Sequence, residues 1–136
     1  SDHFIKLLNR YALIEIEFIA KTRTTSSSLP DGIKTSEGEI ILSRLGDSNF
    51  VALHDRGDAL TSEKFALLLD KLTAHQRGTL IFVIGGAHGL DKKVLARAQH
   101  CISLSPLTFS HQVVRLVLLE QLYRAFTILE GTDYHK

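Results

Sequence analysis

Apolar and polar residues alternate along this chain in a pattern that predicts strands and helices in turn. Short apolar runs of strand length occur at residues 49–54, 79–84 and 101–104. Between them, residues 62–74 and 90–99 carry apolar positions at helical spacing. Strands that alternate with helices imply a mostly parallel sheet with helices on both faces, so we expect an α/β domain.

The first third of the chain has a less regular pattern. Residues 2–11 have the spacing of the end of a helix, and residues 13–19 alternate like a strand with one acidic face. Residues 21–36 are polar and include a proline-aspartate-glycine sequence, which predicts a surface loop. A pattern that resembles a capping box predicts a short helix over residues 36–45, ending at residue 44 or 45. Residues 55–58 are interpreted as the turn after the strand at 49–54.

The segment 111–129 is apolar around most of its circumference. A helix with this pattern must be buried on more than one side. In so small a domain we expect one of these sides to contact a second copy, which predicts a homodimer. The alternative is a central helix that is buried wholly within its own fold.

Composition narrows the class of protein. The chain has 136 residues, 44% of them hydrophobic, and is expected to form a single domain over residues 1–136. Its formal net charge of +1 speaks weakly against a free-standing nucleic-acid binder. Its apolar runs are too short for a membrane span and its start has no signal-peptide pattern. The single cysteine, Cys101, fits a core thiol in a reducing cytosol, so we expect a cytoplasmic protein.

Two loops follow predicted strands and precede predicted helices. The loop from Gly85 to Gly89 has glycines that let the backbone turn tightly and bring its N–H groups close to a ligand. Its spacing is not that of a dinucleotide-binding or Walker loop. The loop from Ser105 to Ser110 alternates hydroxyls with apolar side chains, which suits a ligand with an adenine face and a polar tail. Two such loops at strand ends favour a site for a nucleotide-like ligand. Each loop alone also fits an ordinary turn between a strand and a helix. In the second loop, Ser110 or Thr108 would then cap the helix that follows.

Other candidate groups carry weaker signals. The seven histidines lack the spacing of metal ligands and Cys101 has no partner, so no metal is predicted. The absence of a Gly-x-Ser-x-Gly sequence leaves a serine hydrolase without support. The final Tyr134, His135 and Lys136 could stack on a base and hold a phosphate, but a frayed terminus is the ordinary interpretation of such an end.

Four segments in order resemble the RlmH family of SPOUT-class methyltransferases, which modify large-subunit (23S) ribosomal RNA. They are Val83 to Leu90, Leu104 to Arg115, Glu120 to Ala125, and Tyr134 to Lys136. The resemblance extends from about Phe4 to the end of the chain. It implies a SPOUT-type α/β fold with a C-terminal trefoil knot, a homodimer, and S-adenosylmethionine as the cofactor. It also implies methylation of N3 of a pseudouridine on the assembled ribosome.

The resemblance also implies which residues form the site. Those expected to line the cofactor pocket are Leu53, Gly85, Gly86, Gly89, Ser105, Pro106, Leu107, Thr108, Phe109 and Ser110. Those expected on the RNA side, some of them across the dimer, are His111, Arg115, Tyr123, Arg124, Tyr134, His135 and Lys136. We expect His135, or as second choice His111, to remove the N3 proton. Arg115 or Arg124 would steady the negative oxygen that results.

The chain departs from the family pattern in three places. The opening strand of the family is expected to be absent from this sequence. His54 stands between Leu53 and Asp55, where many members have Leu-Asp, and Ser110 stands where a proline commonly precedes the motif histidine. Three other functions stay open: a non-catalytic RNA-binding or ribosome-assembly module of the same fold, a SPOUT methyltransferase acting on tRNA, and a generic nucleotide-binding scaffold.

Overall fold

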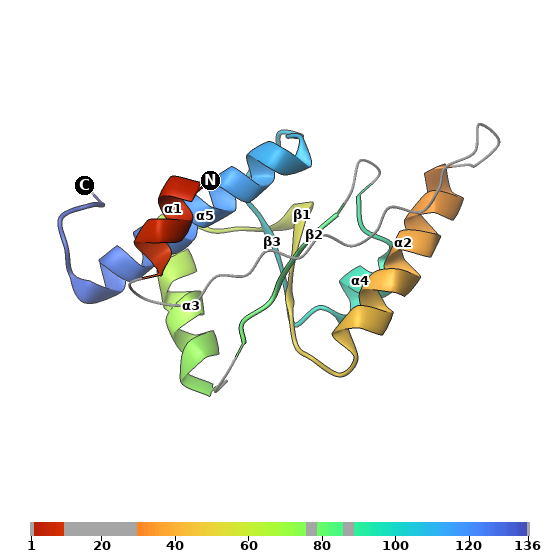
Figure 1. The fold of residues 1–136 in the computed structure, drawn as a ribbon, viewed down its shortest axis with the longest axis horizontal. Helices are drawn as coiled ribbons and strands as arrows, with labels where there is room; N and C mark the ends of the chain where they lie inside the picture. The colour runs from red at the N-terminus through yellow and green to blue at the C-terminus, as the bar shows by residue number, and fades with distance from the viewer. Residues whose placement is uncertain (1, 10–29, 76–78, 86–88, 136) are drawn as a thin grey trace.

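The computed structural model describes residues 2–9, 30–75, 79–85 and 89–135 (Figure 1). The helices are α1 (Asp2–Leu8), α2 (Pro30–Leu45), α3 (Ser62–His75), α4 (Lys92–Arg97) and α5 (His111–Glu130). The strands are β1 (Val51–Ala59), β2 (Phe82–Ile84) and β3 (His100–Ser103). Among the described residues, no helix combines the length and the apolar character needed to span a bilayer.

The three strands form one parallel sheet in the order β2-β1-β3. In the central strand, Leu53 lies opposite Ile84 of β2 and Ile102 of β3. Because all three strands run the same way, their carboxyl ends meet at one edge of the sheet. The predicted α/β class and the parallel sheet are therefore confirmed.

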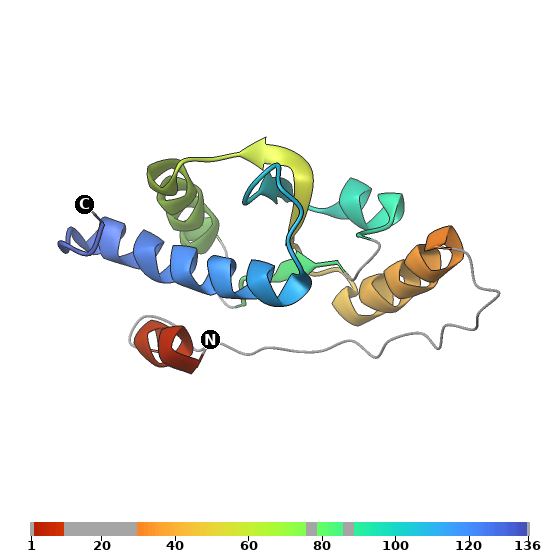
Figure 2. The same ribbon diagram turned by 90° about the horizontal axis from the view of Figure 1, so that it is seen from above.

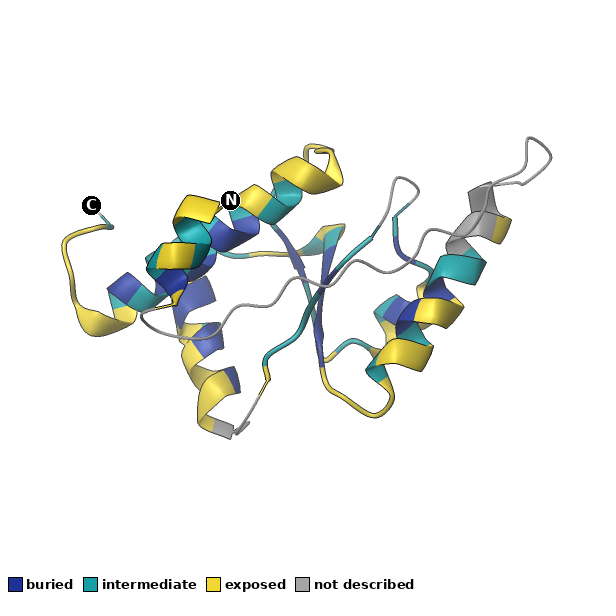
Figure 3. Ribbon diagram, in the orientation of Figure 1, coloured by how far each residue is buried: buried dark blue, intermediate teal, exposed yellow. Residues whose placement is uncertain are grey.

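Helices cover both faces of this sheet, as predicted. Successive residues of a strand point to opposite faces, and β1 follows this rule. Val51 and Leu53 join a core with α1, α3 and α5, whereas Ala52 joins a second core with α2 and α4. The two groups of helices lie on either side of the strands in Figures 1 and 2. Buried positions concentrate on β1 and on the sides of the helices that face it (Figure 3).

The predicted helices at residues 62–74 and 111–129 are confirmed as α3 and α5, with bounds within one residue of those expected. Thr61 caps α3, its hydroxyl accepting a hydrogen bond from the Lys64 N–H at 3.2 Å. Ser110 caps α5 in the same way, accepting from the Val113 N–H. The elements β2, α4 and β3 also lie where expected, but β2 and α4 are shorter than predicted and β3 is shifted by one residue.

The prediction of a loop over residues 21–36 is wrong from Pro30 onward, where α2 begins. Proline has a fixed φ and no N–H, both of which suit the first position of a helix, so the sequence that suggested a turn starts a helix instead. Ser36 lies within α2 and is not its cap. The predicted end at Leu45 is confirmed, and Gly46 follows with a left-handed φ of 55°. The predicted strand over residues 13–19 lies outside the described residues.

The predicted turn at residues 55–58 is also wrong, because β1 continues to Ala59. The pairing with β3 shifts between Leu53 and Asp58, so that Asp58 lies opposite Ile102. Gly57 lets the two strands approach at this irregularity. A Cβ at that position would lie 2.8 Å from the backbone of Cys101 and Ile102, closer than real contacts allow.

Candidate functional site

The two predicted cofactor loops leave the same edge of the sheet. The loop of residues 85–89 follows β2 and the loop of residues 105–110 follows β3, and these strands flank β1 on its two sides. Figure 1 shows β2 and β3 on the two sides of β1, with the segment that joins β3 to α5 at the edge where the strands end. The buried Leu53 lies in the central strand between them. Parallel sheets bind nucleotide-like ligands outside this edge.

The two described glycines of the first loop, Gly85 and Gly89, lie close together. A Cβ on Gly85 would lie 2.7 Å from the carbonyl carbon of Gly89 and 3.0 Å from the Leu90 side chain. Gly89 has a left-handed φ of 81°, which a side chain would disfavour. Both glycines are therefore required by the backbone path. Gly86, also predicted to line the cofactor pocket, lies outside the described residues.

The second loop is held by its own polar groups and presents exposed side chains. The Ser105 hydroxyl accepts a hydrogen bond from the Leu107 N–H at 3.0 Å, and the Ser103 hydroxyl donates to the Ser105 carbonyl at 3.0 Å. From Pro106 to Ser110, including Thr108, every residue is exposed. Leu107 is 69% exposed and Phe109 is 38% exposed. Such apolar groups would be covered by a ligand or by another chain.

A cavity of about 160 Å³ lies where the carboxyl end of β3 meets α3 and α5, and Ser103 and Leu104 line it on the side of the second loop. Its lining includes Ser62, Phe65, Val117 and Gln121. It is smaller than the roughly 300 Å³ at which small-molecule pockets begin, so we assign it no ligand. Within the described part of the chain, no group of three or more His, Cys, Asp or Glu side chains could hold a metal ion.

The C-terminal tail folds back along α5, so the ordinary interpretation as a frayed end is wrong for Tyr134 and His135. Gly131 reverses the chain with a φ of 74°, and the Thr132 N–H donates to the Thr127 carbonyl at 3.0 Å. The ring of Tyr134 then meets Tyr123 edge-on, with the ring centroids 4.8 Å apart. Lys136, the last residue of the predicted RNA-side group, lies outside the described residues.

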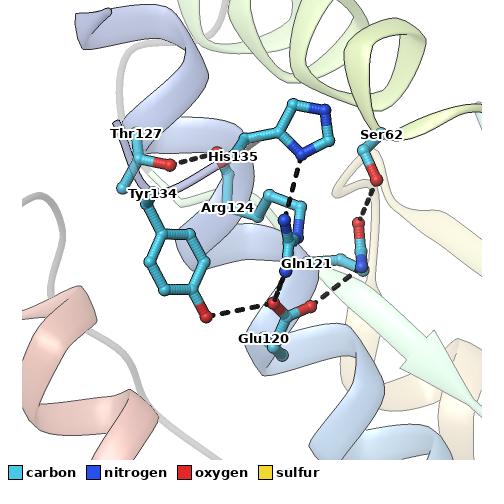
Figure 4. A network of polar contacts seen from close by, with 7 residues as sticks. All are labelled: Ser62, Glu120, Gln121, Arg124, Thr127, Tyr134 and His135. Carbon is cyan, nitrogen blue, oxygen red and sulfur yellow. Dashed lines mark hydrogen bonds and ion pairs between the residues drawn. The ribbon is translucent and has the colours of Figure 1, made fainter. Parts of the chain in front are cut away.

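A polar network anchors this tail (Figure 4). Glu120 accepts two hydrogen bonds from Arg124, at 2.6 and 3.1 Å, and a third from the Tyr134 hydroxyl at 3.2 Å. The Arg124 guanidinium also lies 4.9 Å from the centre of the Tyr134 ring. The hydrogen bond to Glu120 raises the pKa of Arg124. Burial, together with Glu120, raises the pKa of Tyr134.

His135 lies between two charged side chains from different helices. Its Nδ1 lies 3.0 Å from Nη1 of Arg124 on α5, and its Nε2 lies 2.8 Å from Oε1 of Glu63 on α3. The hydrogen bond from His135 lowers the pKa of the Glu63 carboxyl. The tail is therefore tied to both helices.

The predicted catalytic residues fall into two groups along α5. His111 begins the helix beside the 105–110 loop, and the half-buried Arg115 follows one turn later. Arg124 lies thirteen residues beyond His111, about 20 Å along the helix axis at 1.5 Å per residue. The side chain of His135 contacts Arg124 at this position. Within one chain, His111 and Arg115 therefore lie at the end of α5 next to the 105–110 loop, and Arg124 and His135 lie toward its other end.

Two acidic residues of this site were missed from the sequence. Glu120 had a usable signal, since an acid four residues before Arg124 forms a favourable pair on a helix. Glu63 had none, because its contact with His135 joins residues that are 72 positions apart.

Comparison with known proteins identifies the family. A family model described as a predicted SPOUT methyltransferase matches residues 1–135. The chain belongs to the SPOUT methyltransferase family. Among curated proteins, this SPOUT chain is similar to several named ribosomal RNA large subunit methyltransferase H, which confirms the resemblance to the RlmH group.

Three of these relatives illustrate the extent of the match. The protein from Clostridium botulinum (strain Kyoto / Type A2) is 42% identical over 139 residues, covering 99% of this SPOUT chain and 87% of the relative. The one from Bifidobacterium animalis subsp. lactis is 45% identical with the same coverage. The one from Finegoldia magna is 42% identical over 125 residues, covering 91% of this chain and 79% of the relative.

Proposed function

We propose that this protein transfers the methyl group of S-adenosylmethionine to N3 of a pseudouridine in large-subunit ribosomal RNA, acting on the assembled ribosome. The observation that carries the proposal is that β2 and β3, which lead into residues 85–89 and 105–110, flank Leu53 of β1 in one parallel sheet. Relatives that are 42% to 45% identical are named ribosomal RNA large subunit methyltransferase H. The proposal includes a C-terminal trefoil knot around these loops and a cytoplasmic location, where ribosomes work.

The described residues fit such a cofactor. Gly85 and Gly89 themselves carry no side chains, which leaves their backbone open to a ligand at the sheet edge. Leu107 and Phe109 offer exposed apolar surface for an adenine ring. Hydroxyls such as that of Thr108 offer hydrogen bonds to the polar tail. When bound, the cofactor supplies a methyl group already activated by its sulfonium, and the protein must align it with the acceptor nitrogen.

The fit of the glycine loop leads to a binding prediction. We expect Gly85→Ala to weaken S-adenosylmethionine binding by about tenfold or more, because the added Cβ would force the loop away from Gly89. Calorimetric titration measures this directly. Gly32→Ala is the matched control, since a Cβ at Gly32 meets nothing within 4 Å. Equal affinities for the two variants would argue that the cofactor binds elsewhere.

A homodimer belongs to the same proposal. The 105–110 loop leads into His111 at the start of α5, whereas His135 contacts Arg124 about 20 Å farther along the helix axis, so these two parts of the predicted site are separated within one chain. The half of α5 next to the loops also exposes apolar side chains, with Val113 at 43% and Leu116 at 42%. A second copy packed on this surface would cover them and could bring its own tail to the loops.

His135 is the proposed base of the reaction. Its Nδ1 would take the proton from N3 once Arg124 has turned away from it. Arg124 would then donate to the carbonyl oxygen next to N3, where negative charge develops. His111 and Arg115, on the loop side, form the alternative pair for these two roles.

The proposal is tested by methyl transfer from labelled cofactor to ribosomes that lack the modification, followed by mapping of the methylated nucleotide. We expect label at N3 of one pseudouridine of the large-subunit RNA. Label in tRNA only would replace the proposed substrate. No label, together with no calorimetric binding of the cofactor, would indicate a non-catalytic module of the same fold.

A further inference from the structure

The contact between Glu63 and His135 is unlike the rest of the tail network. The contacts of Glu120 stay within α5 and the tail, whereas Glu63 reaches His135 from the first turn of α3. The Glu63 side chain is 62% exposed and that of His135 is 27% exposed. Even fully charged exposed pairs contribute only about 0–1 kcal/mol to stability, so this contact adds little to the stability of the fold.

The hydrogen-bonding groups of Arg124 and Glu63 both require the same tautomer of the His135 ring. An arginine guanidinium only donates hydrogen bonds, so Nδ1 of His135 must accept from Arg124. Glu63 is an exposed carboxylate, which is ionised at neutral pH and has no proton to donate, so it only accepts. Nε2 must therefore carry the ring proton. The ring is held as the neutral tautomer that has its free electron pair on Nδ1.

Arg124 and Nδ1 together form a donor and an acceptor 3.0 Å apart. A cyclic imide such as the N3 edge of a uracil-type base presents the matching pair, an N–H beside a carbonyl oxygen. In the free protein the two groups satisfy each other. On binding an imide, Arg124 can donate to the carbonyl while Nδ1 accepts from the N–H, so that both exchange partners without loss of a hydrogen bond.

We propose that Glu63 is a positioning residue for methyl transfer, which keeps Nδ1 of His135 as the proton acceptor after Arg124 has turned to the substrate. This inference rests on the proposed function. In the step, the N3–H bond breaks and its proton goes to Nδ1. The electron pair on N3 forms the bond to the methyl carbon, and the pair of the broken carbon–sulfur bond stays on sulfur. Glu63 faces the Nε2–H throughout and stabilises the positive charge that the ring acquires.

The first experiment detects the hydrogen bond in the full-length protein, without any substrate. In ¹⁵N-histidine-labelled protein, we expect the Nε2 of His135 to carry the ring proton and to give a resonance protected from solvent exchange. Glu63→Gln, whose amide oxygen can still accept, should keep this resonance, and Glu63→Ala should lose it. A wild-type ring with its proton on Nδ1, or a resonance unchanged in Glu63→Ala, would overturn the proposal.

The second experiment measures turnover on ribosomes that lack the modification. We expect Glu63→Ala to lower kcat by about tenfold or more with unchanged KM values, and Glu63→Gln to recover part of the loss. Asp70→Ala, an exposed acid on the same helix, should leave kcat unchanged. Wild-type kcat in Glu63→Ala, or a loss that appears in KM or in the melting temperature alone, would count against a positioning role.

The two experiments separate the inference from the function on which it rests. A wild-type protein that shows the Nε2–H resonance but methylates no RNA would refute the proposed function and leave the role of Glu63 in fixing the ring supported. A wild-type protein that methylates the RNA, with a Glu63→Ala variant that keeps the wild-type kcat, would refute the role of Glu63 and leave the proposed function supported.

Discussion

Replacing His135 by alanine is expected to slow single-turnover methylation by about 100-fold or more. A positioned general base contributes roughly 10²- to 10⁴-fold, and N3 cannot attack the methyl group while it keeps its proton. The measurement uses excess enzyme, saturating labelled S-adenosylmethionine and ribosomes that lack the modification. Under these conditions the rate reports the chemical step and not product release.

Two further variants make this result specific. His111→Ala removes the alternative base at the start of α5, and a larger loss there than in His135→Ala would transfer the role to His111. His3→Ala in α1 is the control for a histidine outside both groups of predicted catalytic residues. A rate for His135→Ala within a few fold of the wild-type rate would exclude His135 as the base.

Replacing Phe50 by alanine is expected to lower the free energy of unfolding by about 3–5 kcal/mol, the usual cost of truncating a core phenylalanine. Phe50 is only 1% exposed and belongs to the core that joins the sheet to α2 and α4. The Arg97 guanidinium also lies 5.3 Å from the centre of its ring, and this contact would be lost too. Chemical denaturation at a fixed protein concentration measures the change, because a dimer would make stability depend on concentration.

Leu67→Ala is the matched control for this measurement. Leu67 is 66% exposed on α3, so its truncation should cost less than about 1 kcal/mol. A loss below about 1 kcal/mol for Phe50→Ala would mean that the core of α2 and α4 adds little to the stability of the fold.

The parts of the fold that the sequence predicts well are those governed by a regular repeat. In α3, Phe65, Leu69 and Leu72 recur at helical spacing and all three are buried in the core. The apolar runs of β2 and β3 likewise predict these strands to within a few residues, since strands of a sheet that helices cover on both faces are rich in apolar residues.

The parts that failed depend on contacts with distant residues. Gly57 suggests a turn when only its neighbours are considered, but its lack of a side chain lets β1 pair again with β3 beyond the irregularity. Pro30 is compatible with a turn and with the first position of a helix, and the local sequence does not choose between them.

The same division applies to the candidate site. The two loops could be predicted because each follows a strand directly, and parallel strands place their ends together. The order of the tail could not be predicted from residues 131–135 alone, because it depends on Glu120 and Arg124 in α5 and on Glu63 in α3. The local sequence does not reveal contacts between residues that are distant in the chain and meet only in the folded protein.

The position of the tail along α5 has a genetic consequence. If each reaction centre combines the loops of one copy with the tail of another, a variant damaged only at Gly85 and one damaged only at His135 are defective for complementary reasons. Mixed dimers of the two would contain one centre with both defects and one with neither. Co-expressed, two poorly active alleles would then restore methylation that neither provides alone.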